Sequence, residues 1–347
     1  FGWQQSQKMK IGDLHAGAPA LHEDSRYNQD TFLITDKYAI SVDYLSILVE
    51  TSPESCTSYE VMNAIDELQW KMSNVQGVQS AASLASVSKV VNAGYNEGNP
   101  KWRVLPRNQQ TMVQAIARIP TSSGLLNGDC SVMPIILFME DHKAETISRV
   151  INAVKEFRED YQTDNLKFQL ASGPVGVMAA QNEAVEAAQN PMMAYVFGAV
   201  ILLCLISFRS LRATLSVVIP LYVVSVLAQA LMTYLKIGLT VSTLPVIALG
   251  VGIGVDYGIY ILSTMNAKLK AGMAVRQAYF EALKERGSAV LFTGATLAVG
   301  VSTWVFSSLK FQMDMGILLT FMFVVNMMGA IIVLPALAAI FWRKQKD

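Results

Sequence analysis

Long apolar runs fill the part of the chain after Pro191, and they constrain the fold more than any other feature. Each has close to the roughly 20 residues that a helix needs to cross the hydrocarbon core of a bilayer. The composition agrees, at 52% hydrophobic and 16% charged residues. We therefore expect a transmembrane domain of five helices over residues 191–347. The expected spans are about 192–208, 213–234, 239–263, 288–308 and 315–341.

The basic residues between these runs predict the orientation of the chain. Ten of them follow the first, third and fifth runs, whereas only Lys236 and Lys310 lie in the two alternate links. The positive-inside rule places the ten in the cytoplasm. Residues 1 to about 190 are then expected in the periplasm, as part of a multi-pass protein of the cell inner membrane. The ten are Arg209, Arg212, Lys268, Lys270, Arg276, Lys284, Arg286, Arg343, Lys344 and Lys346.

The opening FGWQQSQKMK lacks the apolar core of a signal peptide. Five spans behind an external amino end require a sixth span upstream to carry that segment across the membrane. We therefore expect the chain to be one half of a longer polypeptide, with the other half as its partner.

Residues 1–190 are expected to form an external α+β domain. Apolar runs at 44–50, 132–140 and 166–172 predict strands, and helical spacing of apolar residues predicts helices at 58–72 and 144–157. This order favours two βαβ units of ferredoxin-like type. Residues 94–130, which include Trp102, are expected to be an irregular loop whose exposed apolar groups could touch a greasy ligand. A helix over 174–190 is expected to continue into the first span.

The cysteines divide by compartment. Cys204 lies in the first apolar run, where a small thiol packs, while Cys56 and Cys130 lie in the external half. That half is oxidising if it faces the periplasm, so we expect a disulfide between Cys56 and Cys130. The alternative is a pair of unbonded buried thiols.

Motifs for enzymes, metals and nucleic acid are not found. His15, His22 and His142 have no metal-ligand spacing, and no nucleophile and base pair stands out. The spacing Gly250-x-Gly252-x-Gly254 lacks a glycine at the third glycine position of the fingerprint G-x-G-x-x-G, and it lacks the strand of a dinucleotide site. We expect no cofactor, no metal, no enzyme activity and, with a net charge of zero, no binding of nucleic acid.

The third run contains the segment GVGIGVDYGIY, which holds a single acid, Asp256. A carboxylate near the middle of a bilayer costs roughly 2.5 to 3.5 kcal/mol on insertion scales, so it indicates function. Gly250, Gly254 and Gly258 recur every four residues, which predicts a flat helix face for close packing. Gly252 lies one turn before the acid; we expect it to take part in the helix packing with these glycines and to leave room for water.

No Lys or Arg lies within the five apolar runs, so Asp256 has no basic partner there. It can lower its desolvation cost by taking up a proton. Thr293 and Thr296 match it in depth, and Tyr257 adjoins it, so these groups are the expected proton relay. The alternative is an acid that stays neutral and only links two helices.

The residues GVGIGVDYGIYIL, TGATLAVGVSTWVFS and LPALAAIFW resemble the resistance-nodulation-division superfamily. More narrowly, the chain is similar to the carboxy-terminal half of hydrophobe and amphiphile exporters related to mycobacterial membrane large proteins and hopanoid transporters. The resemblance implies two halves, twelve spans, two porter domains and proton antiport, with Asp256 and Tyr257 as one of two Asp-Tyr pairs. The chain differs from drug-efflux members, since it lacks their intramembrane lysine and has too short an external region for their channel-docking domain.

We therefore expect export of hydrophobic or amphiphilic molecules driven by the proton-motive force. Membrane lipids, the substrate and the other half of the transporter are the expected partners, and a homo-oligomer is an open alternative. A SecDF-type protein-translocation motor and a lipid- or sterol-sensing receptor of the same fold are alternative functions.

Overall fold

The computed structural model describes residues 2–342, which form two compact units. One unit consists of His15–Ala18 and Glu23–Gln181. The other contains the described parts of Phe1–Leu14, Pro19–His22 and Asn182–Asp347. We call them the external unit and the membrane unit.

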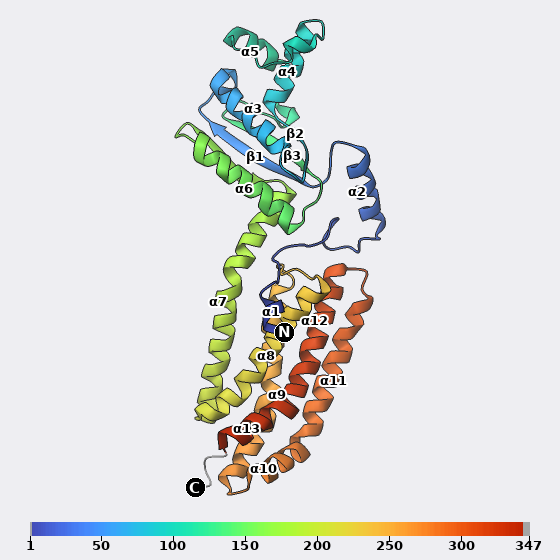
Figure 1. Ribbon diagram of the computed structural model, residues 1–347, viewed down its shortest axis with the longest axis vertical. Helices are drawn as coiled ribbons and strands as arrows, with labels where there is room; N and C mark the ends of the chain where they lie inside the picture. The colour runs from blue at the N-terminus through green and yellow to red at the C-terminus, as the bar shows by residue number, and fades with distance from the viewer. Residues whose placement is uncertain (1, 343–347) are drawn as a thin grey trace. The chain divides into compact units, whose positions relative to one another are not determined.

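A four-stranded sheet forms the centre of the external unit (Figure 1). Its strands are ordered β2-β3-β1-β4, and every neighbouring pair is antiparallel. One helix connects β1 to β2 and another connects β3 to β4, so the sheet is built from two β-α-β stretches, with further helices in the segment between β2 and β3. The elements are β1 Tyr44–Thr51, α3 Tyr59–Ser73, β2 Val78–Ala82, β3 Val132–Met139, α6 Ala144–Tyr161 and β4 Leu166–Ser172.

The core of this unit follows from the spacing of apolar residues. Alternate residues of β3 are buried, as expected for a strand with one face against the core. In α6, apolar residues three and four positions apart are buried, because this spacing places them on one side of a helix. The strands and helices predicted near residues 44–50, 58–72, 132–140, 144–157 and 166–172 are confirmed.

All four strands share one sheet in which β3 lies between β1 and β2, so the two predicted βαβ units are interleaved in a single sheet. The strand β2 and two helices, α2 Arg26–Lys37 and α4 Leu84–Tyr95, were not predicted. Ser83 begins α4 with a capping box, since its hydroxyl accepts from the backbone N–H of Ser86.

The segment 94–130 is only partly irregular. It contains α5 Gln109–Ile116 and the short 3₁₀ helices η2 Pro100–Trp102 and η3 Thr121–Ser123. The side chain of Asn108 accepts hydrogen bonds from two backbone N–H groups in the first turn of α5, which is why a helix begins in this polar stretch.

A disulfide joins Cys56 to Cys130, with 5.5 Å between their Cα atoms. Cys56 lies in the 3₁₀ helix η1 Ser55–Thr57, and Cys130 lies just before β3. The bond therefore connects the start of α3 to the end of the 94–130 segment, as the sequence predicted. Cys204 is a buried free thiol in the membrane unit.

Five helices of the described chain are long and apolar enough to cross a membrane. The first, α7 Pro174–Phe208, runs through Pro191 without a break, which confirms the predicted continuation from 174–190 into the first span. The next two are α8 Leu211–Leu235 and α9 Leu244–Lys270. The fourth covers Val275–Phe306 and includes α10 Val275–Ala282 and α11 Ser288–Ser302, and the fifth covers Lys310–Trp342 and includes α12 Lys310–Met328 and α13 Leu334–Trp342.

Helix α12 packs against α8, α9 and α11, and α9 also packs against α8 and α10 (Figure 1). The short helix α1 Gly2–Ser6 packs on α8. Backbone hydrogen bonds join the segment after α1 to the loop before α9, with Gly12 N donating to Leu239 O at 2.8 Å. Residues 1–14 and 19–22 therefore group with the membrane helices, which differs from the expected boundary at residue 190.

The helices extend beyond the apolar runs, so their ends carry charges that the spans themselves lack. Lys310 and Asp314 form an ion pair of 3.3 Å in the first turns of α12. Lys268 in the last turn of α9 pairs with Glu285 at 2.6 Å. Three of the ten basic residues used for orientation, Arg343, Lys344 and Lys346, lie outside the described residues.

Candidate functional site

Asp256 lies near the middle of α9, far from the charged ends of that helix. It belongs to a row of exposed residues spaced three and four apart, which places them along one side of the helix. We call this row the open face of α9. It consists of Leu249, Gly252, Asp256, Tyr260 and Ser263.

The carboxylate of Asp256 has no hydrogen bond or ion pair with any described residue. The packed side of α9 faces α8 and α12, and the open face is directed away from them. The acid is thus presented outward from the helix bundle at mid-helix depth.

Tyr257 has the opposite environment. Its side chain is 2% exposed and belongs to the apolar cluster formed with residues such as Val217 and Leu334. Its hydroxyl is buried and has no hydrogen-bond partner among the described residues. A rotation of about 100°, one residue along the helix, therefore separates an outward acid from an inward phenol.

The predicted glycine stripe lies on the packed side of α9. A Cβ added to Gly250 would collide with the Met322 side chain, and one added to Gly258 would lie 3.0 Å from Val217. At Gly254 it would lie 2.5 Å from the amide carbon of Asn326. Side chains of α8 and α12 occupy the space that these glycines leave.

Gly252 does not take part in this packing, which corrects its assignment as a packing residue. It is exposed on the open face, and no atom of the described chain lies within 4 Å of a Cβ built there. The space beside Asp256, one turn away, is therefore open within this chain.

The structure does not bring Thr293 and Thr296 into hydrogen bonds with Asp256. Each hydroxyl donates to a backbone carbonyl one turn earlier in its own helix, Thr293 to Ala289 and Thr296 to Phe292, the latter at 2.7 Å. Both side chains are exposed on α11, which packs along α12. Their part in a relay remains a proposal.

Asn326 is a buried polar group of the site that the sequence analysis missed. It lies in α12, is 4% exposed, and its side-chain amide donates to the backbone carbonyl of Gly250 at 2.9 Å. Such a bond links α12 to α9 directly beside the glycine stripe. An amide within an otherwise apolar run was the signal that could have identified it.

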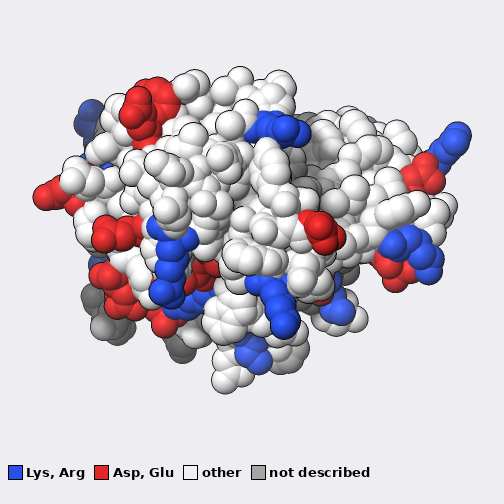
Figure 2. Space-filling model, turned by 90° about the horizontal axis from the view of Figure 1, so that it is seen from above, with Lys and Arg blue, Asp and Glu red and all other residues white. Residues whose placement is uncertain are grey.

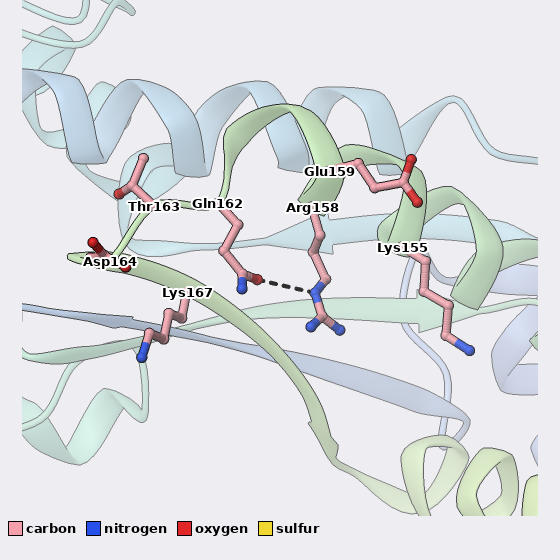
Figure 3. A pocket seen from close by; sticks show the side chains of 7 residues that line it. All are labelled: Lys155, Arg158, Glu159, Gln162, Thr163, Asp164 and Lys167. Atoms are coloured by element: carbon pink, nitrogen blue, oxygen red, sulfur yellow. Dashed lines mark hydrogen bonds between the residues drawn. The ribbon is translucent and has the colours of Figure 1, made fainter.

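A hollow of the external unit, about 780 Å³, lies at the carboxyl end of α6 (Figure 3). Arg158 donates to Gln162 at 3.2 Å, while Lys155 and Lys167 lie at opposite ends of the hollow. Acidic and basic groups both line it. Charged groups of both signs are also interspersed over the face of the molecule in Figure 2. This hollow therefore offers no selective site for one charge.

Each of the three histidines contacts an oxygen atom of another described residue. His15 lies 2.8 Å from Glu23, His142 lies 3.0 Å from Asp43, and the ring of His22 lies 3.0 Å from the carbonyl oxygen of Ser307. Within residues 2–342, no three His, Cys, Asp or Glu side chains are grouped closely enough to hold a metal ion.

The chain is similar to MJ1562 of Methanocaldococcus jannaschii, which is named as a membrane protein. The two are 22% identical over 332 residues, which is 92% of this chain and 82% of MJ1562. It is also similar to MmpL12 of Mycobacterium tuberculosis, named as a probable transport protein, at 24% identity over 180 residues. That match covers 50% of this chain and 15% of MmpL12.

The model of the MMPL family matches residues 38–346, which include the sheet of the external unit and all five apolar helices. The resemblance to exporters of the resistance-nodulation-division type is thereby confirmed, and the helices and relatives together support a multi-pass membrane protein. The chain therefore belongs to the MMPL family.

Proposed function

We propose that this chain is part of a transporter that exports hydrophobic or amphiphilic molecules across or out of the inner membrane, driven by the flow of protons. The observation that carries the proposal is the position of Asp256, outward at mid-helix and without a partner among the described residues. The similarity to MmpL12, a probable transport protein, supports it.

The proposed mechanism starts from the free-energy cost of an ionised acid within the membrane. An ionised carboxylate is costly in hydrocarbon, and no described cation offsets that cost, so proton uptake is the simple way to lower it. Protonated and ionised Asp256 then favour different packing of the open face. Each cycle of proton uptake and release would switch the helices between two arrangements.

The energy available is sufficient for such a switch. One proton that moves through 100 mV supplies about 2.3 kcal/mol. This shifts a two-state equilibrium by roughly fiftyfold, since about 1.4 kcal/mol corresponds to tenfold.

The open face of α9 is the surface that the other half of the transporter would cover, because it is uncovered within this chain and carries the acid. Tyr257, Thr293 and Thr296 are proposed to pass protons to or from Asp256 through water. Gly252 leaves the space beside the acid that such water needs.

The external unit is proposed to be a periplasmic porter domain of ferredoxin-like type, with membrane lipids and the amphiphilic substrate as its contacts. Its two β-α-β stretches, whose four strands share one antiparallel sheet, support this assignment. Protons serve as the coupling ion and no cofactor is proposed.

The test compares Asp256→Asn with Asp314→Asn in the complete transporter, reconstituted in vesicles that carry an internal pH dye and a fluorescent phospholipid. We expect Asp256→Asn to stop both proton flux and lipid export. Asp314 serves as the matched control, because it is paired with Lys310 at the end of α12 and its change should leave proton flux intact.

Unchanged proton flux in the Asp256→Asn protein would overturn the proposal. Lipid binding by the unmodified protein without any proton flux would favour a lipid-sensing receptor instead. Unaltered thermal unfolding of both variants would show that neither effect arises from misfolding.

A further inference from the structure

A second cavity of the external unit, about 580 Å³, lies between α3, α4 and the segment that follows η2. Its volume is in the range of cavities that bind small molecules. The side chains that decide its chemistry are Tyr59, Asp66, Lys89, Trp102, Arg103 and Arg107.

The charges that line the cavity favour an anion. Lys89 is held by Asp66, whose carboxylate oxygens lie 2.5 Å from its amine, so these two charges offset each other. Arg103 and Arg107 remain, and neither forms an ion pair with a described acid. Arg103 also lines an adjoining hollow of about 440 Å³. Guanidinium groups bind phosphate and carboxylate through paired hydrogen bonds.

Aromatic rings lie beside these cations. The guanidinium carbon of Arg107 is 5.8 Å from the centre of the Tyr59 ring. Trp102 lines the same cavity and is 50% exposed, so part of its surface is open to a ligand. Rings of this kind bury alkyl or flat groups of a ligand. The cavity therefore combines anion recognition with an apolar contact surface.

The segment that carries Trp102 and Arg103 is fixed in place by α4. Asn92, which is 4% exposed, donates two hydrogen bonds from its side-chain amide, to Trp102 O at 2.9 Å and to Val104 O at 3.1 Å. The disulfide at Cys56 holds the 3₁₀ helix η1 that precedes Tyr59, another lining residue. Such a preformed site loses little conformational freedom when a ligand binds.

We propose that this cavity binds an anionic amphiphile, with a phosphate or carboxylate group on Arg103 and Arg107 and the apolar part against Trp102 and Tyr59. The inference does not depend on proton coupling, since it concerns binding alone. A protein that fails to transport protons can still bind such a ligand here.

The experiment measures binding of dodecyl phosphate to the full chain, purified in a neutral maltoside detergent, by isothermal titration calorimetry. We expect Arg103→Gln with Arg107→Gln to weaken binding at least tenfold. The matched control is Arg118→Gln, because Arg118 lies over the Tyr95 ring outside the cavity. All proteins share the same micelle, so partition of the ligand into detergent does not differ between them.

Two further measurements define the ligand. Trp102→Ala should weaken binding of dodecyl phosphate severalfold and leave binding of inorganic phosphate unchanged, which would place the apolar part of the ligand on the indole. Equal affinity for inorganic and dodecyl phosphate would overturn the proposal that the ligand is an amphiphile. The cavity would then be a site for free phosphate. Equal binding of dodecyl phosphate by the double variant, the Arg118→Gln control and the unmodified chain would overturn the site altogether.

Discussion

Asp256 and Tyr257 are consecutive in α9, but they face opposite environments, with the acid exposed on the open face and the phenol 2% exposed inside the helix cluster. Consecutive residues of a helix point about 100° apart. Tyr257 is therefore on the packed side of α9, whereas Asp256 is on its open face. The carboxyl of Asp256 is therefore open to groups outside this helix cluster, whereas the hydroxyl of Tyr257 is enclosed by the cluster.

Replacement of Tyr257 by Phe should leave stability unchanged or raise it, because the buried hydroxyl has no described partner and its removal relieves a desolvation cost of about 1 to 3 kcal/mol. The matched control is Tyr279→Phe, which removes a hydrogen bond of 2.7 Å to the carbonyl oxygen of Ile331 and should cost about 1 kcal/mol. Thermal unfolding of both variants checks this. A larger loss for Tyr257→Phe than for Tyr279→Phe would contradict the prediction.

Gly254→Ala should destabilise the membrane unit by about 1 to 3 kcal/mol, because the new methyl group would lie 2.7 Å from a methyl of Leu221 and 2.5 Å from the amide of Asn326. Gly252→Ala should be tolerated, since no described atom lies within 4 Å of its Cβ. The comparison of unfolding temperatures in detergent checks the difference. Equal effects of the two substitutions would show that the packed side of α9 is assigned wrongly.

Loss of the disulfide should destabilise the external unit by about 2 to 4 kcal/mol, because the bond closes a long loop between residues 74 positions apart. Cys56→Ser with Cys130→Ser and reduction of the unmodified chain should lower the unfolding temperature equally. Cys204→Ser is the control and should leave the response to reductant intact. A chain whose unfolding is insensitive to reductant would contradict the prediction.

Asp141 should contribute stability that depends on pH. Burial raises the pKa of its carboxyl, but hydrogen bonds from Thr146 and Lys143 outweigh this and hold the pKa below its ordinary value of 3.8. A lowered pKa in the folded state means that the contribution is complete above about pH 5 and is lost as pH falls through the folded pKa, below 3.8.

Asp141→Asn should therefore reduce the free energy of unfolding at pH 7 by about 1 to 2 kcal/mol and lower the unfolding temperature. Below about pH 4 the difference in unfolding temperature from the unmodified chain should shrink. Asp24→Asn, at an exposed position, serves as the control for the general effect of removing a charge. A difference that stays constant from pH 7 to pH 3 would exclude the carboxylate as its cause.

The sequence predicted those elements whose own residues have a strong pattern. The apolar alternation of Val132–Met139 and the helical spacing of Ala144–Tyr161 are such cases, because burial on one side imposes the period. The strand Val78–Ala82 was missed, since its residues VQSAA are short, small and partly polar. Its strand form depends on pairing with β3, which adjacent residues do not encode.

The candidate site also contains contacts that neighbouring residues do not encode. The position of Asp256 within an apolar run was evident from the sequence, whereas the depth match with Thr293 and Thr296 did not produce contact, because α11 packs on α12. Depth along a helix is fixed by residue number, but which helices are neighbours depends on side-chain packing across the bundle. Asn326 was missed for this reason, as its contact with Gly250 joins residues 76 positions apart.

The sequence by itself determined the five apolar helices, the single mid-helix acid and the pair of external cysteines, because hydrophobicity, charge and residue type are local properties. Only the tertiary structure decided that Asp256 faces outward while Tyr257 faces inward, that Gly252 stands apart from its packed neighbours, and that Tyr59 shares one cavity with Trp102 and two arginines. These relationships arise from contacts between residues distant in the chain, where close packing selects one arrangement from the many that the local pattern permits.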